Sequence, residues 1–467
     1  MLMALEFALL VIIFAALVVT VTFISHIFLQ VTRLPRLIFY IAVGLLIGPL
    51  GFNLLNPTLF ATLDPGGQIL RAVIGVAVAI IVFEGGYSFN RCMPHEQACS
   101  PMEFRTLIRN VLRLSLVGGF LTAGLMTLVF FSLAGFSLPF ALLMGALTMI
   151  TGPTVINPCV RRLGIKEEVA FTLEGEGLIN DALGVIIASG IFSAILASIS
   201  GSPFALPVVV AFNLAVGILI GLGIGALGVF VSQWLGPRFL KRFQDRCDQP
   251  GVEHLSRIGM LVAAFCAYAI AEFLAHETGI IAALVAGILI GNRDRLGFTH
   301  PEDWHETTFA EMDLKHHIEK GVYAFQSDLA QLAIATVFLL LTAFLTWDLL
   351  YITLFTPFFL AGLVVVVLLM LVIRPLAVMI STIRTKFHLR ERYFMSFFGP
   401  RGIVIAATGV FIAITLDVRY GLFLPQIPGY IFLIVLLTVI IQAGLAPFTA
   451  RACKICTAHY DTENTVE

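Results

Sequence analysis

Long apolar runs, separated by short polar segments, recur along almost the whole chain. Each run holds roughly 20 residues, which is enough for a helix to cross a hydrocarbon core about 30 Å thick. The pattern therefore predicts an all-α polytopic membrane protein with about 13 transmembrane helices. The predicted helices lie near residues 4–25, 35–52, 67–87, 106–133, 137–160, 170–199, 204–235, 257–275, 277–292, 327–346, 350–382, 394–416 and 427–449.

Composition and charge support this class. Hydrophobic residues make up 59% of the chain and charged residues 12%, against about 25% charged residues in soluble domains. Basic residues concentrate in the loops after the odd-numbered helices and in the tail, whereas the other loops hold little beyond Arg71 and Arg419. By the positive-inside rule, this pattern predicts an N-terminus outside and a C-terminus in the cytoplasm.

The chain is predicted to form one membrane domain, residues 1–450, followed by a short cytoplasmic tail, residues 451–467. The longest polar loop is predicted at about 292–326 and holds several histidines among carboxylates. Such a group can sense pH or bind a metal. Ordinary solvated loop residues are the alternative, and the role of this loop stays open.

Three carboxylates interrupt the apolar helix predicted at 170–199, namely Glu174, Glu176 and Asp181. A carboxylate in the middle of a bilayer costs at least about 2.5–3.5 kcal/mol, so these groups need a proton, a cation or a basic partner. Glu176 and Asn180 are spaced i, i+4 and share a helix face, whereas Asp181 lies about 140° around the helix from Glu176. Glu174 is interpreted as an interfacial residue. The remaining residues, Glu176, Asn180 and Asp181, predict a site for ion or proton movement.

Two predicted helices contain Gly-Pro interruptions at corresponding places, at residues 151–153 and at residues 399–402. Proline removes a backbone donor and glycine tolerates unusual dihedral angles. Each interruption is therefore either a kink or an unwound segment whose free carbonyls and helix ends face ions. Their matching positions favour an inverted-repeat transporter. The predicted parts are a first repeat at 4–199, a linker helix at 204–235 and a second repeat at 257–449.

Three further ionisable residues lie within predicted helices: Glu84, Arg374 and Arg401. Glu84 is either a helix-end glutamate that reaches water or a carboxylate that lines a cavity. The neighbouring glycines, which permit close helix approach, favour the cavity. Arg374 either snorkels to the headgroups or pairs with a buried carboxylate, for which Glu176 is a candidate. Arg401, between Gly and Pro residues, can cap exposed carbonyls of a broken helix.

In this order and on these helices, the motifs resemble those of the monovalent cation/proton antiporter superfamily, on the electroneutral branch of bacterial sodium/proton exchangers. The resemblance runs through nearly the whole chain, and its motifs are weak singly but specific together. It rests on Phe83-Glu84-Gly85-Gly86, Thr151-Gly152-Pro153, Glu176 with Asn180-Asp181, Arg374, Gly399-Pro400-Arg401-Gly402 and Val439-Ile440-Ile441-Gln442. It implies the inverted-repeat antiporter fold with two broken, crossing helices.

The resemblance also implies roles for the ion site. Asp181 would bind either the cation or a proton, beside Asn180, the neutral residue that marks electroneutral members. Thr151 would offer oxygen ligands from the first broken helix, and Glu84 would lie in the ion cavity. Two departures from the family pattern concern the same site: Gly152 stands where many members have an aspartate, and Gly177 stands where some have a serine.

Further roles implied by the resemblance are structural. Glu176 and Arg374 would form an ion pair, while Arg401 and Pro153 would stabilise the broken helices. The protein would be a homodimer in a bacterial inner membrane. We expect no cofactor, no nucleic-acid partner and no metal beyond the transported monovalent cation.

The expected function is secondary active antiport and not an enzymatic reaction. A monovalent cation, with Na⁺ favoured over K⁺ or Li⁺, would exchange for H⁺ by alternating access with 1:1, electroneutral stoichiometry. One alternative is a K⁺ channel or uniporter, but the sequence has no Thr-Val-Gly-Tyr-Gly-like filter. The other is an intramembrane hydrolase with paired carboxylates, but Glu176 and Asp181 are expected to point in different directions.

Overall fold

The computed structural model is built of helices. It describes residues 2–32, 36–55, 68–88, 101–152, 156, 160, 163–199, 206–243, 249–275, 278–293, 309–343, 357–402, 404–406, 408–409, 412, 416, 424 and 426–455. The chain divides into two compact units. The first comprises Met1–Ile74, Pro94–Leu206 and Ala335–Glu467, and the second comprises Gly75–Met93 and Pro207–Ile334.

The predicted membrane class is confirmed by the length and apolar character of the helices. Within the described residues, seven helices are long and apolar enough to cross a membrane, and a bent pair makes an eighth. The seven are Val11–Phe28, Arg105–Ser132, Glu167–Leu196, Ala211–Val231, His254–Leu274, Lys320–Leu340 and Phe359–Ser381; the bent pair is Gln426–Gln442 with Gly444–Cys453. Shorter apolar helices accompany them, and the count of thirteen stays a prediction.

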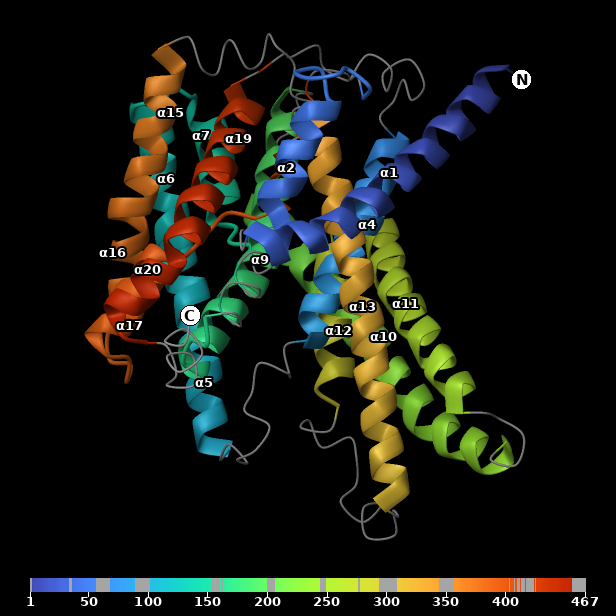
Figure 1. The fold of residues 1–467 in the computed structure, drawn as a ribbon. Helices are drawn as coiled ribbons and strands as arrows, with labels where there is room; N and C mark the ends of the chain where they lie inside the picture. The colour runs from blue at the N-terminus through green and yellow to red at the C-terminus, as the bar shows by residue number, and fades with distance from the viewer. Residues whose placement is uncertain are drawn as a thin grey trace. The chain divides into compact units, whose positions relative to one another are not determined.

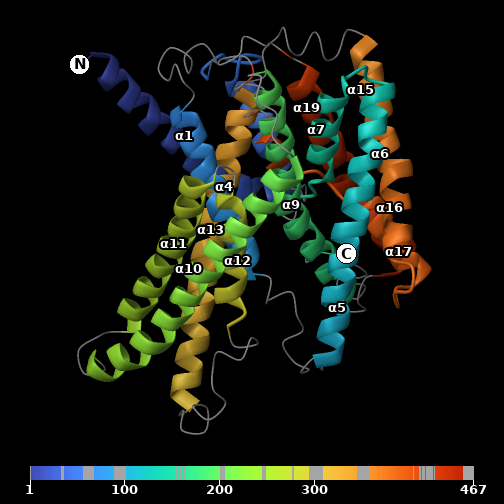
Figure 2. The same cartoon turned by 180° about the vertical axis from the view of Figure 1, so that it is seen from behind.

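The first unit holds the broken helices (Figures 1 and 2). Its α-helices are α1 (Leu2–Thr32), α2 (Arg36–Ile47), α5 (Pro101–Arg113), α6 (Gly119–Ser132), α7 (Leu138–Met149), α9 (Glu167–Ile199), α15 (Pro357–Leu368), α16 (Arg374–Ser381), α17 (Leu389–Phe397), α19 (Gln426–Thr438) and α20 (Gly444–Cys453). Three π-helical turns continue into these helices: η2 (Leu114–Gly118), η4 (Leu369–Ile373) and η5 (Val439–Ala443). Helix α7 packs between α6 and α9.

A fully buried hydrophobic cluster supports the broken helices from one end of this unit. Val169 and Leu173 of α9 pack with Phe394 of α17, with Phe398 directly after it, and with Ala446 of α20. The rings of Phe394 and Phe398 stack at a centroid distance of 5.4 Å. The first turns of α9, which precede its buried carboxylates, and the helix that leads into the second break are therefore parts of one core.

The second unit contains α10 (Leu206–Phe243), α11 (Gln249–Leu274) and α12 (Gly279–Gly291), together with most of α4 (Gln68–Ser88) and α13 (Phe309–Ala343). Helix α12 packs closely against its neighbours through glycine. A Cβ atom on Gly287 would lie 2.4 Å from the carbonyl oxygen of Phe83, and one on Gly221 of α10 would lie 2.7 Å from that of Ala282. Small residues of this kind let apolar helices approach closely in a membrane.

The prediction of a polar loop at 292–326 is wrong over its second half, where the structure has a helix. Helix α13 begins at Phe309, well before the apolar run predicted at 327–346. Hydropathy detects the part of a helix that suits the bilayer, and the polar first turns of α13 carry no such pattern. Residues 294–308 lie outside the described part of the chain.

Candidate functional site

Two helices of the first unit break where the sequence predicts, and the breaks meet. Helix α7 ends at Met149, and Ile150 is extended, with φ −62° and ψ 123°. Helix α17 ends at Phe397, and Phe398 is likewise extended, with φ −100° and ψ 99°. The N–H of Gly152 donates a hydrogen bond to the carbonyl of Pro400 across 3.0 Å. The expected crossing of two broken helices is confirmed.

The crossing point requires glycine in both segments. A Cβ atom on Gly152 would lie 2.4 Å from Cα of Gly402, and a Cβ atom on Gly402 would lie 2.5 Å from Cα of Gly152. Such contacts are with backbone, which cannot rotate away as a side chain can. This crossing therefore has no room for a side chain at position 152.

Arg401 belongs to the second break, and its side chain reaches the end of α7. Its side chain is 1% exposed, and Nη1 donates to the carbonyls of Ile150 at 3.3 Å and Met149 at 3.5 Å. A helix C-terminus has unpaired carbonyls and a partial negative charge, so a cation is favourable there. This position suits the predicted stabilising role of Arg401, which stays a prediction. Pro153, given the same role, lies outside the described residues.

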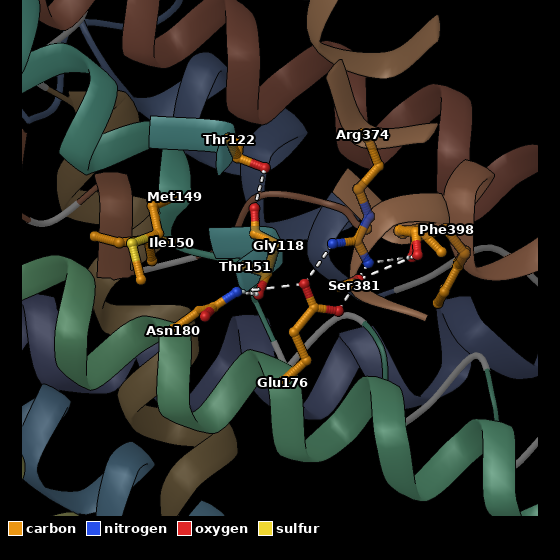
Figure 3. Close-up of polar contacts among 12 residues, drawn as sticks. Gly118, Thr122, Met149, Ile150, Thr151, Glu176, Asn180, Arg374, Ser381 and Phe398 are labelled. Carbon is orange, nitrogen blue, oxygen red and sulfur yellow. Dashed lines mark hydrogen bonds and ion pairs between the residues drawn. The ribbon is translucent and has the colours of Figure 1, made fainter. Parts of the chain in front are cut away.

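Glu176 of α9 forms a buried ion pair with Arg374, the first residue of α16. Nη2 of Arg374 donates to Oε2 of Glu176 at 2.8 Å, and Nη1 contacts Oε1 of the same carboxylate. The two side chains are 2% and 1% exposed, and Figure 3 shows them pointing toward each other. The guanidinium also donates to the carbonyl of Phe398 at 3.4 Å. Arg374 is thus a partner of Glu176 and does not snorkel.

Asn180 links this ion pair to the first break. Its Nδ2 donates to Oγ1 of Thr151 and to Oε1 of Glu176, both at 3.3 Å. The dashed lines in Figure 3 follow this path from Thr151 through Asn180 and Glu176 to Arg374. The structure therefore brings four of the predicted residues into one buried hydrogen-bond network, anchored at both broken helices.

Asp181 is buried without a complete set of donors. It is 4% exposed, and among the described residues its buried Oδ1 has no hydrogen-bond partner. Arg401 is close enough to interact with it electrostatically. A buried carboxylate normally has donors or a cation around both oxygens. The donor set of Asp181 thus suits a bound cation or proton.

Other predicted residues have different positions. Glu84 is half-buried on α4, in the second unit, and its place in an ion cavity stays a prediction. Glu174, interpreted as interfacial, is 3% exposed, so it belongs to the buried face of α9. Within the described part of the chain, no three His, Cys, Asp or Glu side chains gather in a way that could hold a metal ion.

The sequence pattern assigned no role to Thr438, and it included Gln442 only as part of a motif. Both contact the second break: Oγ1 of Thr438 accepts from the N–H of Arg401, and Oε1 of Gln442 accepts from the N–H of Gly399. Their i, i+4 spacing in an otherwise apolar helix was the available clue, because polar residues in such a helix usually face a partner.

Two broken, crossing helices beside a buried carboxylate, in a chain with several apolar helices long enough to span a membrane, are typical of an ion-coupled secondary transporter. The chain belongs to the sodium/hydrogen exchanger family, whose transmembrane family model matches residues 13–452. The family consists of transporters and not of enzymes, so the protein is an antiporter of this class. The hydrolase and channel alternatives are thereby set aside.

Individual relatives agree with this assignment. The chain is 24% identical over 443 residues to Na⁺/H⁺ antiporter 1 of Methanocaldococcus jannaschii, covering 90% of each protein. It is 33% identical over 159 residues to the Na⁺/H⁺ antiporter ApNhaP of Aphanothece halophytica, covering 34% of this chain and 27% of the relative. The fold matches the structure of the sodium proton antiporter MjNhaP1 from M. jannaschii at pH 8, with a TM-score of 0.68 and 20% identity over 95% of this chain and 99% of that one.

Proposed function

We propose that this protein exchanges Na⁺, with K⁺ or Li⁺ as the other candidates, for H⁺ across a bacterial inner membrane by alternating access. The observation that carries the proposal is Asp181: a carboxylate buried in α9, with an oxygen that no hydrogen-bond donor in the described structure reaches. A carboxylate out of water is costly as an isolated ion, so it binds either a proton or a cation. Competition between the two at one carboxylate couples their transport.

The surroundings of Asp181 support a stoichiometry of one cation for one proton. Glu176 is neutralised by Arg374, and breaking such a buried pair is expensive. Asn180 carries no titratable proton. One carboxylate therefore remains to change partners, and an exchange of one positive charge for another moves no net charge. Transport would then be electroneutral.

Oxygen ligands for the cation would come from residues next to Asp181. Thr151 is fully buried at the first break, and its Oγ1 already accepts from Asn180. Alkali cations are bound in proteins by oxygens that replace their hydration shell. We assign Thr151 to the cation site together with Asp181, with Asn180 holding Thr151 in place. A part for Glu84 in that site stays a prediction from the family resemblance.

The membrane orientation and assembly belong to the same proposal. Basic residues in the odd loops favour an N-terminus outside and a C-terminus in the cytoplasm. A homodimer is proposed from the family resemblance. Cross-linking in native membranes and labelling of single cysteines placed in the terminal segments would test both points; a monomer or a labelled C-terminus outside would contradict them.

Exchange in liposomes tests the function itself. Purified protein is reconstituted with a pH-sensitive dye inside, and Na⁺, K⁺ and Li⁺ are added in turn with the membrane voltage clamped. We expect proton efflux in response to the transported cation, unaffected by voltage and absent in Asp181→Asn. A current that scales with voltage would contradict the 1:1 stoichiometry. Full activity of Asp181→Asn would show that the carboxylate is not the site.

A further inference from the structure

The second broken segment, residues 398–402, is held from the side of the last helices by two side chains. Oε1 of Gln442 accepts from the N–H of Gly399 at 3.2 Å, and Oγ1 of Thr438 accepts from the N–H of Arg401 at 3.1 Å. Pro400, between them, has no N–H. Two of the backbone donors that the unwinding releases at this turn are therefore accepted by side chains of α19 and of the turn η5 that follows it.

Two carbonyls of the same turn have partners on other elements. Phe398 accepts from Arg374, and Pro400 accepts from the N–H of Gly152. An unpaired buried backbone group costs about 1–3 kcal/mol. Thr438 and Gln442 supply the only acceptors that the described structure gives to these two donors, so the extended shape of the segment depends on them.

Both side chains are buried, and that of Thr438 is also held by its own helix. Thr438 and Gln442 are each 1% exposed. The hydroxyl of Thr438 donates to the carbonyl of Ile434 at 2.6 Å, which directs its lone pairs toward Arg401. Helix α19 ends at Thr438, and the π-helical turn η5, which contains Gln442, follows directly. Such turns occur frequently at functional sites.

We propose that Thr438 and Gln442 are positioning residues for cation exchange. They hold the second break so that Arg401 reaches the end of α7 and Pro400 pairs with Gly152, the neighbour of Thr151. Loss of either acceptor lets the segment relax, and through Gly152 it moves the oxygen of Thr151 away from the cation. This role rests on the proposed function, although neither side chain contacts the ion.

Hydrogen–deuterium exchange tests the placement directly, without transport. Thr438→Val keeps the shape of the side chain and removes the acceptor, while Thr438→Ser keeps the acceptor. We expect amide exchange in a peptide covering residues 398–402 to be about threefold to tenfold faster in Thr438→Val and unchanged in Thr438→Ser. The matched control is Thr449→Val, whose hydroxyl bonds only within its own helix. Equal protection in Thr438→Val and the wild type would overturn the proposal.

Transport kinetics test the functional part. Thr438→Val and Gln442→Met should raise the KM for Na⁺ about threefold to tenfold, with little change in maximal rate and with Thr438→Ser like the wild type. An unchanged KM in an active protein would overturn the positioning role and leave the proposed function intact. Absence of cation/proton exchange in the wild type would overturn the proposed function. The hydrogen–deuterium exchange of the amides would still show whether Thr438 holds the second break. If Thr438→Val does not fold, the same test uses Gln442→Met, which removes the acceptor, and Gln442→Glu, which keeps one. Hydrogen–deuterium exchange is then compared at the amide of Gly399.

Discussion

Glu176 and Asp181 lie little more than one turn apart on α9 and are almost equally buried, at 1% and 4% exposure. Their surroundings differ. Glu176 receives hydrogen bonds from Arg374 and Asn180, whereas Asp181 keeps a buried oxygen without a hydrogen-bond partner in the described part of the chain. Its basic neighbour, Arg401, already donates to the carbonyls of Ile150 and Met149.

In the proposed function, this difference separates a structural carboxylate from a working one. Removing the partner of a fully paired buried ion is expensive, so Glu176 cannot change partners during a transport cycle. A carboxylate with an incomplete donor set can bind a proton or a cation and release it. Burial alone, which the two share, does not distinguish the roles; the set of donors does.

The largest expected effect on transport comes from Asp181→Asn. The neutral amide can hold neither a proton nor a cation in place of the carboxylate, so exchange should fall at least about a hundredfold, equivalent to some 2.7 kcal/mol. The melting temperature in detergent should be unchanged or raised, because a poorly paired buried charge is removed. A large drop in melting temperature would mean that Asp181 is structural, as Glu176 is.

The largest expected loss of stability comes from Arg374→Met. It leaves Glu176 charged and unpaired in the core, which should lower the free energy of unfolding by about 3–5 kcal/mol. Adding Glu176→Leu in the same protein should recover part of that loss, because an apolar pair replaces the ion pair. Thermal unfolding of the two single variants and the double variant measures the coupling. Additive losses would contradict the pairing.

Gly152→Ala should disturb the crossing to which both carboxylate sites are anchored. Its Cβ would lie 2.4 Å from Cα of Gly402, so the two broken segments must move apart, at a cost of about 1–3 kcal/mol. The matched control is Gly124→Ala on α6, where no atom lies within 4 Å of the added Cβ. The melting temperature and the rate of cation/proton exchange should both fall in Gly152→Ala and stay unchanged in Gly124→Ala. Equal behaviour of the two would contradict the close crossing.

Thr151→Val should have the smallest effect, and that effect should be mainly on cation binding. It removes the hydroxyl that accepts from Asn180, although Asn180 still donates to Glu176. A single hydrogen bond contributes about 0.5–1.5 kcal/mol, so the KM for Na⁺ should rise about twofold to tenfold. Thr151→Ser should behave like the wild type. If Thr151→Ser raises the KM as much as Thr151→Val does, loss of the oxygen does not account for the effect.

The sequence predicts the class and the breaks because they depend on local chemistry. Gly-Pro pairs disrupt regular helix, as at residues 399–402, and a buried charge such as Glu176 needs a partner, for which Arg374 was a candidate. The close crossing of Gly152 and Gly402, and the acceptor role of Thr438, depend on how distant segments pack. The polar start of α13 was missed because it has no apolar period to detect.

Proton release on cation binding tests the central claim most directly. Purified protein in weakly buffered detergent solution, near the pH where Asp181 would be protonated, is titrated with Na⁺ while a dye counts the protons released and calorimetry counts the ions bound. The account predicts about one proton released per Na⁺ bound in the wild type and none in Asp181→Asn. Undiminished release in the variant, or two protons per cation in the wild type, would contradict a single exchanging carboxylate.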